Sequence, residues 1–501
     1  MINNISLTFV LLLLVCCFNS VKTKKPHILF VLADDYGYND IGYHGSEIKT
    51  PNLDRLSGEG VRLENYYVQP ICTPTRSQIM SGRYQIHTGL QHSLIWAPQP
   101  NALPIAKDSP ILPEKMREAG YTTHAVGKWH LGFYKEEYLP NNRGFDTFYG
   151  YLAGSEDYYT KILCYGKNFC GKDLRDNYEK VDPVPEEYST EMYNNHVIDM
   201  INNYNSSQPM FMYLAFQAVH SPLQVPSRYT DKYAHIKNHN RRIYAGMVSA
   251  MDEAVGNITA ALETKGMWED TIMVFSTDNG GEILAGGNNW PLRGWKRSLW
   301  EGGMHGVGFV HGKALQKKGT VSPELMHVTD WYPTLVGLAG GSLNDTKHLD
   351  GFDQWKTISE GAKSPRETLL HNIDPLTKPV GDKLEGSPFD NRYRAALRWR
   401  DWKLVTGFPG NGSWVPVPTT EDINTDDYSN SSQSLKNLWL FNIAKDPVER
   451  VDLSADYPDM VMKMLTKLQE FNVTSVPCIY PAWDPNSNPE LHGGWWGPWE
   501  K

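Results

Sequence analysis

The sequence predicts an α/β fold in which a large, mainly parallel β-sheet is flanked by helices, followed by a smaller C-terminal α+β subdomain with an antiparallel sheet. Three continuous apolar runs, at residues 26–33, 210–216 and 271–276, predict the parallel strands. Strands buried on both faces show no alternation of polar residues. Helical segments lie between the runs, and this alternation is typical of a parallel sheet covered by helices.

The helices are predicted from end signals and periodicity. Pro51 follows Thr50 where a helix would begin, and residues 113–119 precede Gly120, a typical C-terminal stop. Residues 241–265 repeat apolar side chains at near-helical spacing, which indicates a long amphipathic helix. We therefore expect these helices to cover the sheet.

The pattern changes near residue 385. Residues 394–405 and 438–443 indicate short, half-exposed strands, and residues 460–471 indicate a helix. We therefore expect a large domain over residues 24–385 and a smaller subdomain over 386–501. The tail from Pro481 is rich in Trp, Pro and Gly and is expected to pack as irregular structure.

Composition and the first residues restrict the class of protein. The formal net charge is −9, with acidic and basic residues mixed, which argues against a nucleic-acid partner. Residues 1–23 predict a signal peptide, because the apolar run at 7–18 is too short to span a bilayer. An uncleaved anchor is the alternative, since Lys and Arg are absent before the run. We expect a secretory-pathway protein, lysosomal or extracellular, with no membrane insertion after cleavage.

Acidic and amide side chains follow two of the predicted strands. Asp34 and Asp35 end the first run, and Asp278 and Asn279 end the third. Ligands of open α/β sheets gather at the carboxyl ends of strands, and hard oxygen donors suit Ca²⁺ or Mg²⁺ better than Zn²⁺. The alternative for each pair alone is a turn or a helix cap.

Residues 72–76, Cys-Thr-Pro-Thr-Arg, match the pattern that the formylglycine-generating enzyme recognises in the endoplasmic reticulum. Conversion would turn Cys72 into an aldehyde whose hydrate is a nucleophile. A helix is expected over 75–82, so an anion at Cys72 would meet a helix N-terminus, with Arg76 one turn further on. The alternative is a buried structural cysteine.

Further polar residues surround the predicted strand ends. Lys128 and His130 are two residues apart, so on extended backbone they would face the same way. His220 follows the second run, and Lys296 lies in a Gly-Trp-Lys segment. The alternatives are an exposed polar pair, a structural histidine and a solvated lysine.

Cysteines and glycosylation motifs agree with passage through the secretory pathway. Without the signal peptide and Cys72, three cysteines remain, and Cys164 and Cys170 are close enough to close a small loop. Cys478 is then unpaired or forms an intermolecular bridge. Six Asn-x-Ser/Thr motifs follow the signal peptide and are candidate glycosylation sites. They lie at Asn205, Asn257, Asn344, Asn411, Asn430 and Asn472.

Together these motifs resemble the type I sulfatases of the alkaline phosphatase superfamily, and most of all the arylsulfatase B branch. The matching segments lie at residues 33–37, 72–76, 127–132, 276–281, 286–294 and 300–303. The likeness extends over nearly the whole mature chain.

The resemblance implies the role of each site residue. Asp34, Asp35, Asp278 and Asn279 resemble the ligands of one Ca²⁺, with an oxygen of the modified Cys72 as a further ligand. The formylglycine hydrate would attack sulfur, and Asp278 would take or hold the proton released.

The remaining roles fall to cations and histidines. Lys296 and His220 would neutralise the sulfate and help to protonate the leaving oxygen. His130 would remove a proton from the remaining hydroxyl, while Lys128 and Arg76 would hold the hydrate.

The sequence departs from the family pattern at two positions. Thr75 stands where serine is commoner, and His305 stands where an arginine is usual. The first leaves the cysteine, proline and arginine of the motif intact. The second puts an anion contact or a structural ion pair in doubt.

Substrate and alternative functions stay open at this point. The resemblance implies a sulfate monoester, either a sulfated hexosamine of a glycosaminoglycan or a small ester such as an aryl sulfate, steroid sulfate or glucosinolate. The loops at 154–180 and 375–390 are expected to wall the pocket. The alternatives are a phosphatase or phosphonate hydrolase on the same scaffold, and an inactive binding protein with unmodified Cys72.

Overall fold

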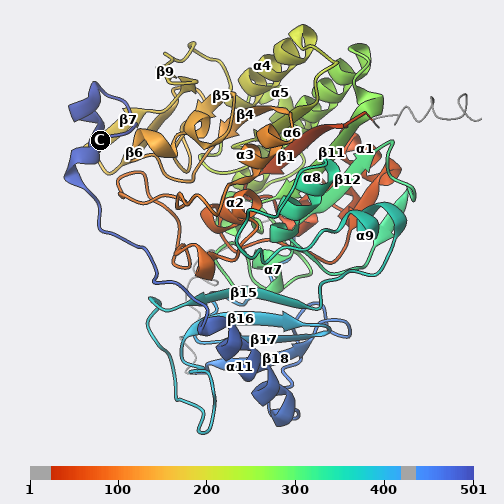
Figure 1. Ribbon diagram of the computed structural model, residues 1–501, viewed down its shortest axis with the longest axis vertical. Coiled ribbons are helices and arrows are strands. Elements are labelled where there is room, and N and C mark those ends of the chain that lie inside the picture. The colour runs from red at the N-terminus through yellow and green to blue at the C-terminus, as the bar shows by residue number, and fades with distance from the viewer. Residues whose placement is uncertain (1–23, 419–435) are drawn as a thin grey trace, which may run out of the picture.

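A ten-stranded sheet forms the centre of the large domain in the computed structural model, which describes residues 24–418 and 436–501 (Figure 1). The strand order is β13-β2-β12-β11-β1-β10-β4-β5-β8-β9. The five central strands run parallel, and the sheet becomes partly antiparallel at both edges. From one edge to the other the strands are Thr320–Ser322, Val61–Leu63, Gly308–Gly312, Thr271–Thr277, His27–Ala33, Met210–Ala215, Thr122–Lys128, Thr147–Tyr151, Arg175–Asp176 and Glu179–Lys180.

The three predicted apolar runs form the adjacent strands β11, β1 and β10, which confirms the predicted parallel sheet. Every residue of these strands is buried, because helices cover both faces. In β1, Phe30 packs into one core and Val31 into the other, as the alternation of side chains along a strand requires.

Two sets of helices cover the sheet (Figure 1). The first set shares a core with Phe30 and comprises α2 (Cys72–Ser81), α3 (Leu112–Glu118) and α8 (Trp331–Leu338). The second set shares a core with Val31 and comprises α1 (Pro51–Glu59), α4 (Ser189–Asn203) and α6 (His239–Thr264). Shorter helices are α5 (Ser227–Thr230), α7 (Glu301–Met304) and α9 (Trp355–Glu360).

A separate antiparallel sheet of four strands forms the smaller subdomain, with helix α11 (Pro458–Asn472) packed on one face (Figure 1). The strands are β15 (Thr368–Asp374), β16 (Arg394–Trp399), β17 (Trp402–Thr406) and β18 (Leu438–Asn442). The predicted strands and helix are thus present. Strand β15, which the sequence pattern did not reveal, precedes residue 386, so the sheet begins within the range expected for the large domain.

The tail returns to the large domain (Figure 1). Trp496 is fully buried in the core that contains Phe30, and its Nε1 donates a hydrogen bond of 3.1 Å to Leu163 O. Residues 485–487 and 489–492 form short 3-10 turns, in agreement with the irregular structure expected there. The division at residue 385 stays a prediction.

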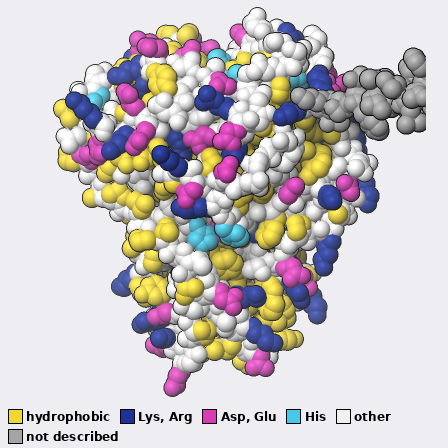
Figure 2. Space-filling model, viewed as in Figure 1, with side chains coloured by type: hydrophobic (Ala, Val, Ile, Leu, Met, Phe, Trp, Pro, Cys, Tyr) yellow, Lys and Arg dark blue, Asp and Glu magenta, His cyan; other side chains and the backbone are white. Residues whose placement is uncertain are grey.

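A disulfide joins Cys164 and Cys170 across the hairpin of β6 (Ile162–Tyr165) and β7 (Phe169–Lys172). Cys478 is a half-buried free thiol. The predicted signal peptide and Asn430 lie outside the described residues. No helix of the described part of the chain is long and apolar enough to cross a membrane. On the face seen in Figure 2, acidic and basic side chains are interspersed, as the composition predicted.

A buried charge cluster joins helix α7 to the smaller sheet. Lys403 on β17 lies 2.8 Å from carboxylate oxygens of both Glu301 and Glu449, and all three side chains are buried. Burial raises the pKa of Glu449 to about 7, whereas Lys403 outweighs burial at Glu301 and holds its pKa well below the usual range. His305, the departure noted above, lies 3.3 Å from Glu301, so this position makes a structural contact.

We predict that Lys403→Met lowers the free energy of unfolding by about 3–5 kcal/mol, because two buried carboxylates lose their common cation. Urea denaturation measures the change. The matched control is Lys445→Met, which alters an exposed lysine of the same subdomain and should have little effect. Equal stability of the two variants would show that the cluster does not hold α7 and the smaller sheet together.

Candidate active site

The predicted site residues converge at the carboxyl end of the central strands. Asp34 and Asp35 follow β1, Asp278 and Asn279 follow β11, and Lys128 ends β4. Backbone hydrogen bonds continue past the strand ends: Asp34 N donates to Ala218 O at 3.0 Å, and Asp278 N donates to Ala33 O at 3.0 Å. The acidic residues are therefore fixed by the sheet itself.

Cys72 begins helix α2 and is buried. Its Sγ lies 3.7 Å from Asp34 Oδ1 and can donate a weak hydrogen bond to it. Burial raises the pKa of the thiol to about 12, although Lys128 opposes the shift. An unmodified Cys72 is therefore a neutral thiol at physiological pH and not the thiolate that cysteine nucleophiles require.

Thr75 ties the first turn of α2 to strand β11. Its Oγ1 donates to Asp278 O at 2.5 Å and accepts from Gln69 N at 2.8 Å. A serine hydroxyl could make the same two bonds, so the threonine at this motif position keeps the local geometry.

Three buried cations face three buried carboxylates. Arg76 Nη2 lies 2.8 Å from Asp278 Oδ2 and 3.3 Å from Asp34 Oδ2. Lys128 Nζ forms an ion pair with Asp34, and Lys296 Nζ lies 2.7 Å from Asp35 Oδ2. The formal charges of these six side chains cancel. A bound divalent cation would therefore leave an excess of positive charge, which would attract an anionic substrate.

The donor set fits a metal ion. Asp34, Asp35, Cys72 and His220 offer ligand atoms within 4.8 Å of one another. The buried Asn279 Oδ1 has no hydrogen-bond partner, while Asn279 Nδ2 donates to Asp35 Oδ1 at 2.8 Å. A buried acceptor left unpaired costs free energy, and a cation would satisfy it. Mostly oxygen donors suit Ca²⁺ or Mg²⁺.

The two histidines present different nitrogen atoms to the site. His130 Nε2 lies 3.0 Å from Ile95 O and 3.2 Å from Thr73 Oγ1, so Nε2 carries the proton, and the buried Nδ1 has no partner. His220 Nδ1 donates to Ser221 O at 2.6 Å, and Nε2 lies 3.6 Å from Asp35 Oδ2. Burial is the main cause that lowers the pKa of both histidines, and nearby cations lower it further. The pKa of His220 is lowered to about 3.

The backbone at His130 differs from the expectation. Strand β4 ends at Lys128, and His130 adopts a positive φ of 54°, so the segment is not extended throughout. Both side chains nevertheless reach the site. Sequence reasoning did not single out Thr73, whose hydroxyl links His130 to the helix that carries Cys72; its place within the 72–76 motif was the available signal.

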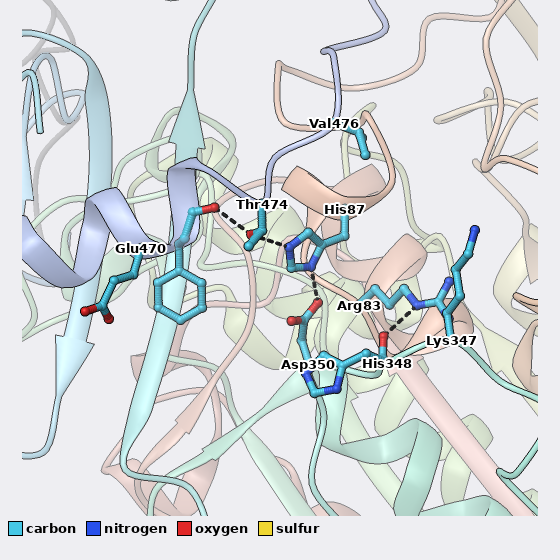
Figure 3. Close-up of a pocket in the computed structure, with 9 residues that line it drawn as sticks. Arg83, His87, Lys347, His348, Asp350, Glu470, Thr474 and Val476 are labelled. Carbon is cyan, nitrogen blue, oxygen red and sulfur yellow. Dashed lines mark hydrogen bonds and ion pairs between the residues drawn. The ribbon is translucent and has the colours of Figure 1, made fainter.

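A cavity of about 620 Å³ lies near the C-terminal end of α2, and none of the predicted site residues lines it (Figure 3). His87 there bridges Asp350 at 2.7 Å and Thr474 at 2.8 Å, and Arg83 Nε donates to His348 O at 3.1 Å. Most of its polar groups already have partners, so the converging residues around Cys72 are the stronger candidate site.

Comparison with known proteins identifies the family. The family model described as Sulfatase matches residues 26–342. The chain belongs to the sulfatase family. It is 52% identical over 486 residues to Arylsulfatase J of Mus musculus, covering 96% of this chain and 81% of that protein. It is 27% identical to N-acetylgalactosamine-6-sulfatase of Mus musculus, covering 91% of this chain and 87% of that protein.

Solved structures agree. Ps i-CgsB in complex with k-i-k-neocarrahexaose is 28% identical and superposes with a TM-score of 0.75, covering 94% of this chain and 98% of that one. The phosphonate monoester hydrolase of Agrobacterium radiobacter has a TM-score of 0.59 at 18% identity and covers 90% of this chain and 96% of that one, a likeness that shows the fold alone. The protein is accordingly an enzyme that hydrolyses sulfate esters.

We predict that Arg76→Lys lowers kcat/KM for nitrophenyl sulfate about 10- to 100-fold. A single ammonium cannot reproduce the guanidinium contacts to both Asp278 and Asp34, and one lost charge-assisted hydrogen bond is worth about 1.5–3 kcal/mol. Arg55→Lys, which changes an exposed arginine paired with Glu59, is the control. Wild-type kinetics in Arg76→Lys would contradict the role of the paired contacts.

Proposed function

We propose that this sulfatase acts on sulfated sugars in the secretory pathway, with Cys72 converted to formylglycine and one Ca²⁺ bound beside it. The observation that carries the proposal is the clustering of Asp34, Asp35 and His220 around Cys72. Asp278 joins this cluster through Arg76, and Asn279 joins it through Asp35, with a buried amide oxygen that lacks a partner. The neutral thiol of Cys72 supports conversion, because the unmodified side chain is a poor nucleophile.

The two absent groups have separate tasks. When present, formylglycine supplies a hydrate with two hydroxyls on one carbon, which neither a thiol nor a serine hydroxyl offers. Ca²⁺ would be held by the carboxylates of Asp34, Asp35 and Asp278 and by Asn279 Oδ1, and it would supply positive charge next to the sulfate.

The surrounding side chains bind the sulfate and move protons. Ion pairs with Asp35 and Asp34 hold the ammonium groups of Lys296 and Lys128 in the site. There the two ammonium groups neutralise an incoming sulfate. Asp278, whose pKa burial and Asp34 raise to about 6, can take or hold a proton. His130 is neutral with a free Nδ1, which suits a proton acceptor.

His220 and Arg76 complete the proposed set. His220 faces the site with its unprotonated Nε2, so it must gain a proton before it can assist the leaving oxygen, and a bound sulfate favours that gain. Arg76 orients Asp278 and Asp34 through its guanidinium.

A carbohydrate substrate is favoured by the relatives. N-acetylgalactosamine-6-sulfatase is named for a sulfated hexosamine, and Ps i-CgsB was solved with k-i-k-neocarrahexaose. An aryl sulfate, steroid sulfate or glucosinolate is the second candidate, because the name Arylsulfatase J refers to aryl esters.

The secretory route rests on the formylglycine motif, whose partner enzyme works in the endoplasmic reticulum, on the predicted signal peptide and on the glycosylation motifs. Asn205, Asn257, Asn344 and Asn472 are exposed and Asn411 is half-exposed, so all five can carry a glycan. The final destination is lysosomal or extracellular.

We predict that protein produced in a host with the formylglycine-generating enzyme hydrolyses nitrophenyl sulfate. The peptide of this protein that contains residue 72 should react with hydrazide probes. Cys72→Ala and Cys72→Ser should lose turnover, because neither side chain can be converted. Peptide mass spectrometry and sulfate release measure the two properties.

Two results would overturn this assignment. An unmodified Cys72 thiol in protein from a host with the formylglycine-generating enzyme would favour the alternative of an inactive binding protein. Strong preference for nitrophenyl phosphate over nitrophenyl sulfate would favour the phosphatase.

We predict that Ca²⁺ raises the Tm of chelator-treated protein and restores its activity more effectively than Mg²⁺. Binding to the native state alone contributes about 2.7 kcal/mol at a hundredfold excess over Kd. Asp35→Asn should lose most of this response, whereas Asp345→Asn at an exposed position should keep it. Full activity after exhaustive chelation would argue against a required metal.

A further inference from the structure

A small cavity of about 220 Å³ is lined by residues on both sides of Cys72 in sequence. Ile71 and Pro74, two of its lining residues, bracket Cys72 and Thr73 in sequence, and consecutive Cα atoms are only about 3.8 Å apart. A third lining residue, Arg297, directly follows Lys296, which pairs with Asp35. The cavity therefore adjoins the two segments that carry Cys72 and Lys296.

Two arginines give the cavity an excess of positive charge. Its ionisable lining residues are Arg297, Arg394, Asp374 and His92. Arg394 Nη1 lies 3.9 Å from Asp374 Oδ2, and Arg394 Nη2 donates to Arg297 O at 2.5 Å. Arg297 is exposed, and among the described residues its guanidinium forms no ion pair.

Asp374 does not neutralise this charge fully, because its carboxylate is shared among several donors. His92 Nδ1 lies 2.9 Å from Oδ1, and Thr377 Oγ1 donates to Oδ2 at 2.7 Å. The backbone N–H of Leu376 also donates to Oδ1 at 3.0 Å. With one carboxylate against two guanidinium groups, the cavity is suited to an anion.

Buried polar atoms of the cavity wall lack partners. Gln91 and Asn372 are only 2% and 5% exposed. Their amide nitrogens donate to Val476 O and Gln91 O, but Gln91 Oε1 and Asn372 Oδ1 accept no hydrogen bond, and Arg394 Nε donates none. These three atoms are enclosed within the wall, so what the cavity offers a ligand is the charge of its two arginines.

We propose that this cavity is a specificity subsite that binds a second anionic group of a sulfated sugar, either a carboxylate or another sulfate. Arg297 and Arg394 recognise the anion through their planar, multi-donor guanidinium groups. The inference rests on the proposed hydrolysis of sugar sulfates and adds the feature by which one such sugar is preferred. A simple aryl sulfate lacks the second anion and gains nothing from the subsite.

Matched substrates test the subsite. They are nitrophenyl sulfate, N-acetylgalactosamine 4-sulfate, its 4,6-disulfate, a 4-sulfated disaccharide containing a uronate, and the same disaccharide after carboxyl reduction. We expect the wild-type enzyme to show a kcat/KM at least tenfold higher for a substrate with a second anion than for its matched partner. Preference for the uronate identifies a carboxylate as the ligand, and preference for the disulfate identifies a second sulfate.

Variants separate recognition from chemistry. Arg297→Gln should raise KM for the preferred substrate roughly 10- to 100-fold, with kcat and nitrophenyl sulfate turnover unchanged. Arg394→Gln should act in the same direction. Since Arg394 also makes contacts within the fold, the exposed Arg297 provides the cleaner variant. Arg400→Gln, on an exposed arginine paired with Glu367, is the control.

A binding measurement makes the test independent of turnover. Titration calorimetry of the uronate disaccharide and of the disulfate into Cys72→Ala should show tighter binding than of the reduced disaccharide, and Arg297→Gln should remove the difference. Equal binding of all three ligands, unaffected by Arg297→Gln, would overturn the subsite. If no sulfate is released from any substrate while this binding difference persists, the proposed function fails and the subsite stands.

Discussion

Burial of three carboxylates at one edge of the central sheet is the constraint on which the site depends. Asp34, Asp35 and Asp278 are almost completely buried, and a buried unpaired charge is strongly destabilising. Their cations come from α2, from the end of β4 and from the segment at Lys296. The site can therefore form only when these distant segments have docked, so assembly of the charge cluster and folding of the large domain are coupled.

The same constraint explains the state of the nucleophile position. With its charges balanced, the cluster does not stabilise a thiolate at Cys72, and burial keeps the thiol protonated. The unpaired oxygen of Asn279 marks the place where the balanced cluster is incomplete. A divalent cation there would satisfy the oxygen and change a neutral cluster into one that attracts an anion. Binding of a metal ion would thus be linked to binding of an anion through the net charge of one group of residues.

The sequence predicted the central strands and the residues at their ends because both follow from local patterns. Continuous apolar runs identify buried strands, and the carboxyl ends of parallel strands meet at one edge. By contrast, β15 contains His371, Asn372 and Asp374 among its apolar residues, which obscures the strand pattern. The docking of Trp496 against Leu163 depends on a contact between residues 333 positions apart, which no local pattern records.

The two sheets carry different groups of residues near Cys72. The groups around Cys72 come from the large sheet and its helices, whereas Asp374 and Arg394 of the neighbouring cavity come from β15 and β16 of the smaller sheet. Lys403 and the core around Trp300 fix that sheet against the large domain. If the proposed subsite recognises the sugar, changes on β15 and β16 would alter that recognition without disturbing the buried charges around Cys72. The proposed subsite and the buried charge cluster adjoin at segments 71–74 and 296–297, where the exposed Arg297 directly follows the buried Lys296.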